Sequence, residues 1–413
     1  MGLHTVVQAL RQKLRRTKAG RPEAGTLAAP RVLFVDDQLP LPTLGAGNPR
    51  ACRLLHELQR AGARTTHYPL GVPEPDMAGA AKVLPAGLEL IVGKDRPALA
   101  PFLQERCGQY DLVLVSRPHN MRQFLACCDE HVPHFLPATR LVYDAEAVVA
   151  PRESLRRKVL GLTSEPGAME LLLANEFALA RRAATVLAVS EAEARRLRDA
   201  GCPDVRVLGH TLMPAPTQSS FDARQGILFV GHLGGDDTPN ADSLRWFVQA
   251  IMPLLDRLIG NDWQLDLVGD CAPGLRAELE SPRVRVHGRV EDPTAHNEGG
   301  RLFIAPTRFA AGIPHKAHEA AARGLPMVAT RLIAGQLGWK EGAALLAADS
   351  PDEFAQACAQ LYRNRKLWER VRTDSLAEVA RDCDPEAFRR VVRRVLEPAV
   401  RRHPLKMRFR ALP

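Results

Sequence analysis

The chain has 413 residues, of which 46% are apolar and 25% are charged. This length favours two or three domains, and the composition is that of a globular protein and not of a disordered one. The sequence contains no run of about 18 apolar residues, so no membrane-spanning helix is expected. No secretory signal is expected either. Eight scattered cysteines without a Cys-x-x-Cys pair argue against a zinc site or a disulfide framework, and they favour a reducing, cytoplasmic location.

The net charge of +9 is concentrated at the two ends of the chain. Residues 1–30 carry a net charge of +5 and residues 389–410 carry +8, so the remainder carries −4. An acidic body with only 5% aromatic residues argues against a nucleic-acid partner. Apolar residues recur at helical spacing in both ends, which favours contact with an anionic membrane surface. The alternatives are a disordered N-terminal tail and a C-terminal helix that packs on the domains and leaves its bases in solvent.

The first half of the chain alternates short apolar runs with helical patterns. Runs typical of buried strands occur at 31–36, 65–68, 88–92, 112–115, 141–143 and 185–189. The first helical pattern covers about 49–62. Strands that alternate with helices predict parallel pairing in an open α/β sheet.

The same pattern starts again after a proline- and serine-containing segment at 209–225, which is predicted to be a linker. Further strands are predicted at 227–230, 265–268, 284–286, 302–305, 326–329 and 343–346. The fold class is therefore α/β, with two doubly wound, Rossmann-like domains. The predicted divisions are a basic N-terminal extension (1–30), an N-terminal domain (31–208), the linker (209–225), a C-terminal domain (226–385) and a C-terminal helix with a basic tail (386–413).

The segment 302–326 carries the clearest pattern for binding chemistry. A buried strand ends at Pro306, a loop contains Gly312, and a helix starts near Pro314. The first N–H groups of that helix face the carboxyl edge of the sheet, where they can bind an anion. Lys316 and Arg308 can add positive charge, and Glu319 shares a helix face with Lys316. The alternative is a tightly packed α/β helix whose charged first turn is merely solvated.

The order of residues Gly312-Ile313-x-x-Lys316-x-x-Glu319-Ala320 resembles the donor-site signature of family-four, retaining glycosyltransferases. Their GT-B fold consists of two Rossmann-like domains that face a central cleft. The resemblance continues in 31–37 with the following glycine loop, in 142–146, in 189–191, and in 229–233 with 267–269.

The resemblance implies a role for each matching residue. Lys316 and Arg308 would neutralise the donor diphosphate, Glu319 would bind the ribose or the donor sugar, and His119 would contact the transferred sugar. The implied donor-binding set is Gly231, His232, Gly269, His287, Val290, Gly312 and Ile313, and Gly45 and Gly47 would form an acceptor-side loop. The alternative for His119 is an ordinary loop residue, and that for Gly45 and Gly47 is a flexible turn.

Two positions depart from the family pattern. Ala311 stands where the family usually has a second glutamate. Gly234-Gly235-Asp236-Asp237 stands where the family usually has a loop with a basic residue. The diphosphate charge would then rest on Arg308, Lys316 and the helix end. No metal ligands and no cofactor beyond the nucleotide-sugar donor are expected.

The function implied by the resemblance is the transfer of a hexosyl group from a nucleotide-diphosphate sugar, with retained anomeric configuration. The acceptor would be a glycan, free or lipid-linked, in polysaccharide biosynthesis, and the enzyme would be cytoplasmic or peripheral at the inner face of the membrane. The alternatives are a sugar-nucleotide epimerase and a non-catalytic GT-B partner protein.

Overall fold

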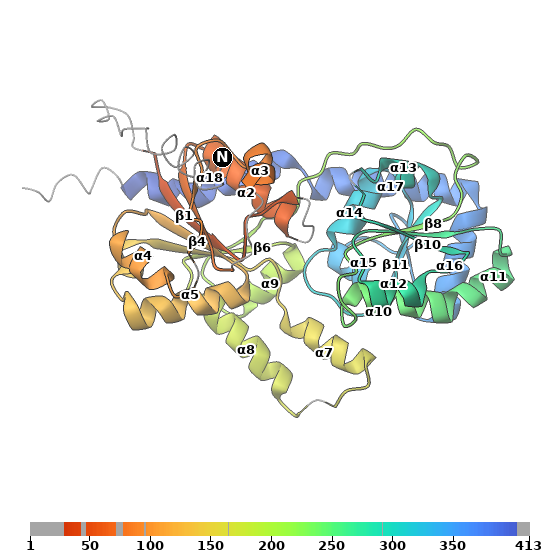
Figure 1. Cartoon of the computed structure of the whole chain (residues 1–413), viewed down its shortest axis with the longest axis horizontal. Helices are drawn as coiled ribbons and strands as arrows, with labels where there is room; N and C mark the ends of the chain where they lie inside the picture. The colour runs from red at the N-terminus through yellow and green to blue at the C-terminus, as the bar shows by residue number, and fades with distance from the viewer. Residues whose placement is uncertain are drawn as a thin grey trace, which may run out of the picture. The chain divides into compact units, whose positions relative to one another are not determined.

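A computed structural model describes residues 29–42, 47–71, 77–94, 96–163, 165–290 and 292–402. The predictions made for residues 1–28, for Gly45 and for the tail after residue 402 lie outside these ranges. The chain forms two compact units (Figure 1). The first lies within 1–41, 51–142 and 392–413, and the second within 42–50 and 143–391. The predicted domain boundaries stay a prediction.

The first sheet has seven strands in the order β3-β2-β1-β4-β5-β6-β7. Strand β1 pairs in parallel with β2 and with β4, and Val32 lies opposite Thr65 and Leu112. The strands are β1 (Arg31–Asp36), β2 (Arg64–Pro69), β3 (Glu89–Leu90), β4 (Leu112–Ser116), β5 (Arg140–Asp144), β6 (Thr185–Ala188) and β7 (Val205–Val207). The helices between them are α2 (Asn48–Arg60), α3 (Met77–Val83), α4 (Leu99–Glu105), α5 (Pro118–His131), α6 (Phe135–Ala138), α7 (Ala150–Val159), α8 (Ala168–Arg181) and α9 (Glu191–Asp199).

The second sheet has six strands in the order β10-β9-β8-β11-β12-β13, and every pair is parallel. The strands are β8 (Ile227–Val230), β9 (Leu265–Val268), β10 (Val284–Gly288), β11 (Leu302–Ala305), β12 (Met327–Ala329) and β13 (Leu346–Ala347). The helices are α10 (Pro239–Trp246), α11 (Met252–Ile259), α12 (Pro273–Leu279), α13 (Thr294–Gly299), α14 (His315–Ala322), α15 (Arg331–Leu337), α16 (Pro351–Arg363), α17 (Arg365–Asp382) and α18 (Pro385–Arg402). The α/β fold class predicted from the sequence is confirmed.

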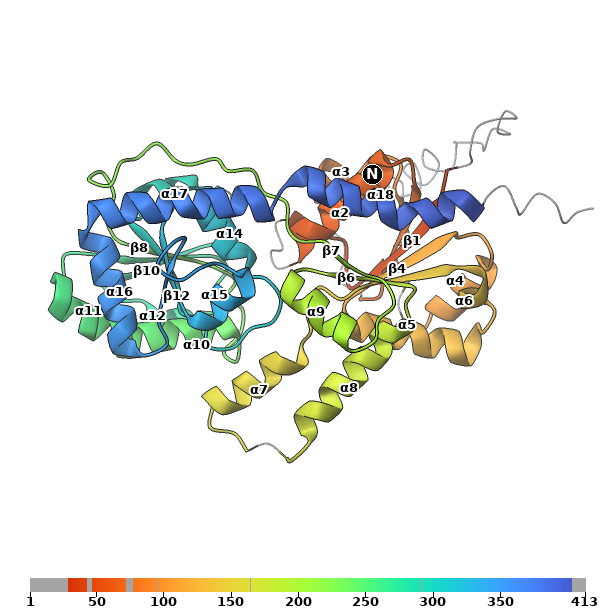
Figure 2. The same cartoon turned by 180° about the vertical axis from the view of Figure 1, so that it is seen from behind.

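Both faces of the second sheet are buried, as expected for a doubly wound fold. Side chains of a strand alternate between faces, so Ile227 and Phe229 join one apolar cluster while Leu228 joins the other. Figure 1 shows α10 and α12 over one face, and α14 and α17 over the opposite one. The latter two helices lie side by side (Figure 2).

The predicted linker 209–225 has no helix or strand of its own, but its backbone is held along its length. Its N–H groups at Leu212, Ala215 and Thr217 donate to carbonyls of residues 383, 322 and 323. Arg224 completes this attachment. Its buried guanidinium donates to the carbonyls of Ser219, Asn297 and Gly300 and to the hydroxyl of Thr217.

Replacing Arg224 with Met should destabilise the protein by about 2–5 kcal/mol, because the buried carbonyls would lose their donors. Arg224→Lys should recover only part of this loss, since an ammonium cannot reproduce the guanidinium fork. The free energy of unfolding in urea would measure both changes. Arg365→Met, which removes a half-exposed ion pair with Asp222, is the control and should cost about 1 kcal/mol or less. Equal costs at the two positions would contradict the structural role of Arg224.

Candidate active site

The carboxyl edge of the second sheet has a topological switch point between β8 and β11. The chain leaves β8 toward β9 on one side, whereas β11 lies on the other side. The loops after these two strands lead into α10 and α14, whose first turns therefore meet above the switch point. Ligands of open α/β sheets bind at such crevices.

Lys316 lies in the first turn of α14, beside this switch point. Its Nζ donates to Asn240 Oδ1 at 2.6 Å and stands 4.3 Å from the centre of the Phe229 ring. Burial lowers the pKa of Lys316 to about 7. Pro314 precedes the helix and provides no side-chain cap, so the first N–H groups of α14 have no capping side chain.

Gly269 and Gly231 bring the ends of β9 and β8 close together next to Asn240. Gly269 has a φ of +139°, and a Cβ placed on it would lie 2.0 Å from the carbonyl oxygen of Gly231. Only glycine fits there. The backbone of these two glycines forms this part of the edge, next to the side chain of Asn240.

The two other polar residues of the predicted donor signature have protein partners. The Arg308 guanidinium donates to both carboxylate oxygens of Asp242 in α10, at 3.0 Å from Nε and 2.5 Å from Nη2. The Glu319 carboxylate lies 3.3 Å from His315 Nδ1, and its side chain is half exposed. Arg308 therefore joins α10 to the loop after β11, and Glu319 keeps access to solvent.

The loop around Gly312 is fixed by residues that sequence reasoning did not single out. Gly312 has a φ of +76°, and a Cβ there would stand 3.3 Å from Ala147. Glu193 in α9 accepts a hydrogen bond from the Val148 N–H at 3.2 Å. Burial raises the pKa of Glu193 to about 7, against the opposite effect of backbone hydrogen bonds from Val148 and Gly312.

Glu193 had a sequence signal. Ser190 and Glu193 have the spacing of a capping box, in which the glutamate returns to the N–H of the cap residue. Ser190 does accept from the Glu193 N–H at 3.2 Å, but the Glu193 side chain bonds to Val148.

The remaining predicted donor residues are spread along the same edge of the sheet. His232 follows β8 with its side chain 65% exposed, 4.0 Å from Asp270. His287 at the end of β10 lies 2.6 Å from Asp266. Val290 and Ile313 are partly buried against the apolar cluster under α14. Among the residues that the structure describes, none of these four forms a hydrogen bond or ion pair with Lys316.

In the first unit, His119 belongs to a charged cluster at the ends of β1 and β4. His119 Nε2 lies 2.5 Å from Asp37 Oδ1, and Arg117 pairs with Asp37 and, at 3.4 Å, with Asp36. Burial alone would raise the pKa of Asp37, but the bond to His119 and the charge of Arg117 lower it. Arg117 has a φ of +75°, which is rare outside glycine and is typical of functional sites.

Gly47 lies next to a different carboxylate. A Cβ on Gly47 would stand 2.3 Å from Glu146 Oε1, so any larger residue would displace this side chain. Glu146 has a φ of +52° and follows β5. Among the described residues, no group of three or more His, Cys, Asp or Glu side chains is arranged to hold a metal ion.

The titration of Glu193 predicts a pH dependence of stability. Folding raises the pKa of this carboxyl from 4.5 to about 7. The folded protein therefore holds this proton more tightly, and the free energy of unfolding falls as the pH rises from about 4.5 to 7. Glu193→Gln cannot titrate, so the parent should lose up to about 3 kcal/mol relative to this variant across the window.

Urea unfolding of both proteins between pH 4.5 and pH 8 would measure this difference. Glu369→Gln, at an exposed position, controls for the loss of a carboxylate. Parallel stability curves for Glu193→Gln and the parent would contradict the assignment.

Comparison with known proteins agrees with this geometry. Residues 224–364 match the family model "Glycosyl transferases group 1". No curated protein matches the chain. Among solved structures, Anabaena HepE in complex with UDP-glucose has a TM-score of 0.63 at 16% identity, over 89% of this chain and 99% of that chain. Sucrose-phosphate synthase from Thermosynechococcus elongatus has a TM-score of 0.64 at 14% identity, over 89% and 98%.

A glycosyltransferase from Rickettsia africae is also similar, with a TM-score of 0.62 at 11% identity, over 89% of this chain and 99% of that chain. At such identities the likeness shows a shared fold, and that fold is the GT-B fold predicted from the sequence. The family match covers the second sheet and the edge that carries Lys316. The predicted resemblance to GT-B glycosyltransferases is thereby confirmed: residues 224–364 are a group 1 glycosyltransferase domain, and membership of the retaining family four stays a prediction.

Proposed function

We propose that this glycosyltransferase moves a hexosyl group from a uridine-diphosphate sugar to a glycan acceptor, with retention of configuration. The observation that carries the proposal is the position of Lys316. Its ammonium stands at the switch point, beside the backbone surface of Gly231 and Gly269 and the uncapped start of α14. These groups together suit a diphosphate.

The proposed chemistry is charge stabilisation of the leaving group. As the bond from the anomeric carbon to the phosphate breaks, negative charge grows on the diphosphate, and fixed donors lower the barrier. Because the pKa of Lys316 is only about 7, a bound diphosphate would also favour its protonated form. Arg308 acts through Asp242 in this proposal, by holding α10 and Asn240 in place.

The choice of uridine as the base is supported by solved structures of similar fold. Structures of Anabaena HepE contain UDP, UDP-glucose, or UDP with glucose. In this proposal the base packs near His287 and Val290, Glu319 binds the ribose or donor sugar, and His119 contacts the transferred sugar. The donor phosphates rest on Lys316 and the first N–H groups of α14, without a metal ion.

An epimerase or a non-catalytic partner would share the donor site but not the reaction. An epimerase converts the nucleotide sugar without any acceptor, and a non-catalytic partner leaves it unchanged. Product analysis of a UDP-sugar incubated with and without glycan acceptors separates the three functions.

UDP should stabilise the protein against heating, whereas GDP, dTDP and CMP should do so less. A ligand present at 100 times its dissociation constant adds about 2.7 kcal/mol to the free energy of unfolding. Lys316→Ala should abolish most of the UDP shift, and Lys340→Ala, at an exposed lysine, should keep it. An unchanged UDP shift in Lys316→Ala would overturn the role of this lysine. Absence of any nucleotide effect on the parent would favour the non-catalytic partner.

We also propose that the protein works in the cytoplasm at an anionic membrane surface. All eight cysteines are free thiols, as expected in a reducing compartment. Within the described ranges, no helix is long and apolar enough to cross a membrane. In α18, Phe388, Val392 and Val395 are buried while Arg393 and Arg394 are exposed, so a basic face remains in solvent.

The pair α7 and α8 adds an apolar surface to this proposal. The two helices pack against each other, and both project from the rest of the second unit (Figure 2). Leu160, Leu162, Leu171 and Leu172 are between 43% and 63% exposed, near the bases Arg156, Arg157 and Lys158 of α7. Exposed leucines beside bases suit an interface with anionic lipid.

Sedimentation with phosphatidylcholine vesicles, with and without phosphatidylglycerol, would test this membrane contact. Binding should require the anionic lipid and should weaken at high salt. The double variants Leu171→Ser/Leu172→Ser and Arg393→Gln/Arg394→Gln should each bind about tenfold less tightly or worse. Leu258→Ser, at an exposed leucine of α11, should bind like the parent. Equal binding to both vesicle types would contradict the proposal.

A further inference from the structure

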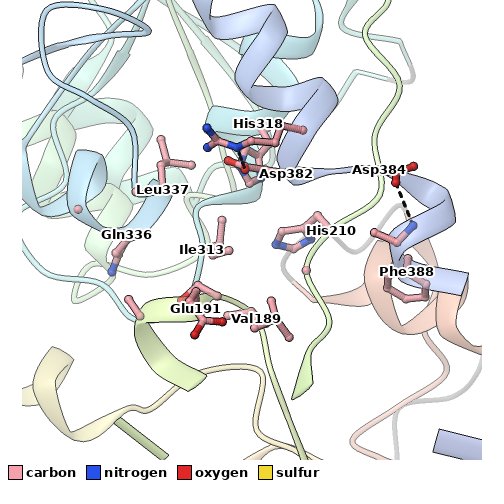
Figure 3. A pocket seen from close by; sticks show the side chains of 18 residues that line it. Val189, Glu191, His210, Ile313, His318, Gln336, Leu337, Asp382, Asp384 and Phe388 are labelled. Carbon is pink, nitrogen blue, oxygen red and sulfur yellow. Dashed lines mark hydrogen bonds and ion pairs between the residues drawn. The ribbon is translucent and has the colours of Figure 1, made fainter. Parts of the chain in front are cut away.

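A cavity of about 360 Å³ lies in the second unit, apart from the Lys316 region. It is lined by five parts of the chain: the start of α9, the segment after β7, Ile313 and His318 at the start of α14, the end of α15, and the junction of α17 with α18. His210 lies between Ile313 and Phe388 in this cavity (Figure 3). The volume is at the lower end of the range for small-ligand sites.

Several residues that line this cavity carry buried polar atoms without partners. His318 is 1% exposed, and neither of its ring nitrogens has a hydrogen-bond partner in the structure. His210 is 7% exposed, and its Nδ1 has none, nor has the buried Oε1 of Gln336. Leaving such buried atoms unpaired destabilises the folded protein. Because all three residues line one cavity, a polar occupant would satisfy them together.

The two imidazoles are neutral at physiological pH. Burial lowers the pKa of His318 to about 4 and lowers that of His210 well below its usual value. A neutral imidazole offers one N–H donor and one acceptor nitrogen. The imidazoles thus present donors and acceptors without a positive charge, and the lining residue Arg381 is paired with Asp382, so the cavity is a poor match for a phosphate.

The carboxylates of the lining already have protein donors. Asp382 accepts from Trp339 Nε1 at 2.8 Å and from Arg381 at 2.8 Å, and Asp384 accepts from two backbone N–H groups. Their charge is compensated, but each oxygen can accept a further hydroxyl group. Ile313, Leu337 and Phe388 supply apolar walls.

Helix α14 separates this cavity from the proposed donor site. His315 and His318 are three residues apart on one face, and the His315 ring lies 4.6 Å from that of His210. Lys316 points to the other side, toward Phe229 and Asn240. The two regions are therefore distinct, although Ile313 of the cavity adjoins Gly312 of the loop.

We propose that this cavity binds a neutral sugar or polyol, separately from the nucleotide-sugar donor. Hydroxyl groups would pair with His210 Nδ1, with the imidazole nitrogens of His318 and with the Gln336 amide. The C–H face of a sugar ring would rest on Phe388 and Leu337. Such a ligand would contact the loop next to Gly312.

Isothermal titration of the full chain with D-glucose, D-galactose and N-acetyl-D-glucosamine, each with saturating UDP, would test the site. At least one sugar should bind saturably, and inorganic phosphate should not. Ala387→Leu, which fills the cavity from α18 with another good helix former, should weaken that binding about tenfold or more. Gln336→Met should weaken it severalfold, whereas Gln360→Met, at an exposed glutamine, should leave it unchanged.

Failure of all three sugars to bind would overturn the proposal and leave the cavity to water. Sugar binding that Ala387→Leu does not alter would place the sugar elsewhere and would also overturn it. A UDP titration of Ala387→Leu keeps the outcomes separate: retained UDP affinity with lost sugar binding supports the cavity. If the parent protein does not bind UDP, this result contradicts the proposed donor site of the glycosyltransferase and not the proposed sugar site.

Discussion

The close packing of helix α14 is the constraint on which both binding regions depend. Ala317, Ala320, Ala321 and Ala322 are buried, and their small side chains let the helix lie tightly against the second sheet and α17. No space remains beneath the helix for a long polar side chain. The polar residues of its first turns must therefore reach past the helix on either side, Lys316 toward α10 and His318 toward the junction of α17 with α18.

Long-range pairs decide what the charged residues of this chain can do. Arg308 stands in the loop where a free cation was expected, but Asp242, 66 residues earlier, binds it. Arg224 is buried in a similar way by carbonyls from two distant segments. A net charge calculated from the sequence includes such arginines as if they could bind ligands. In the folded protein they instead form hydrogen bonds that join distant segments. Lys316 differs because its main partners are a neutral amide and an aromatic ring, which leave its charge to be met by an anion.

The strands and the main motif could be predicted because they depend on local patterns. Buried runs such as 227–230 and 302–305 coincide with β8 and β11, and the loop and helix around Gly312 are where the spacing places them. The apolar face of the C-terminal helix was also predicted correctly. No strand was predicted over 205–207, where β7 has only three partly buried residues. The leucines of α8 gave no one-sided pattern, because that helix buries only Ala180.

The hydrogen-bond partners of the site residues could not be predicted, because the local sequence does not determine which distant residues pack against them. Asn240, Asp242 and Glu193 acquire their roles from contacts with residues 45 to 76 positions away. The spacing of Lys316 and Glu319 correctly put them in one helix, but only packing decides that the lysine turns inward and the glutamate stays half exposed. The histidine cavity likewise combines five separate segments of the chain.

The hydrogen bonds that hold the segment 209–225 limit which changes in its length the protein can tolerate. A flexible spacer tolerates changes in length, because its entropic cost grows only slowly with the number of residues. Here the N–H groups of Leu212, Ala215 and Thr217 each meet a fixed carbonyl, and Arg224 locks the far end. One inserted residue would shift every later group out of register with its partner. The length of this segment is therefore constrained, and engineered insertions and fusions should be placed elsewhere in the chain.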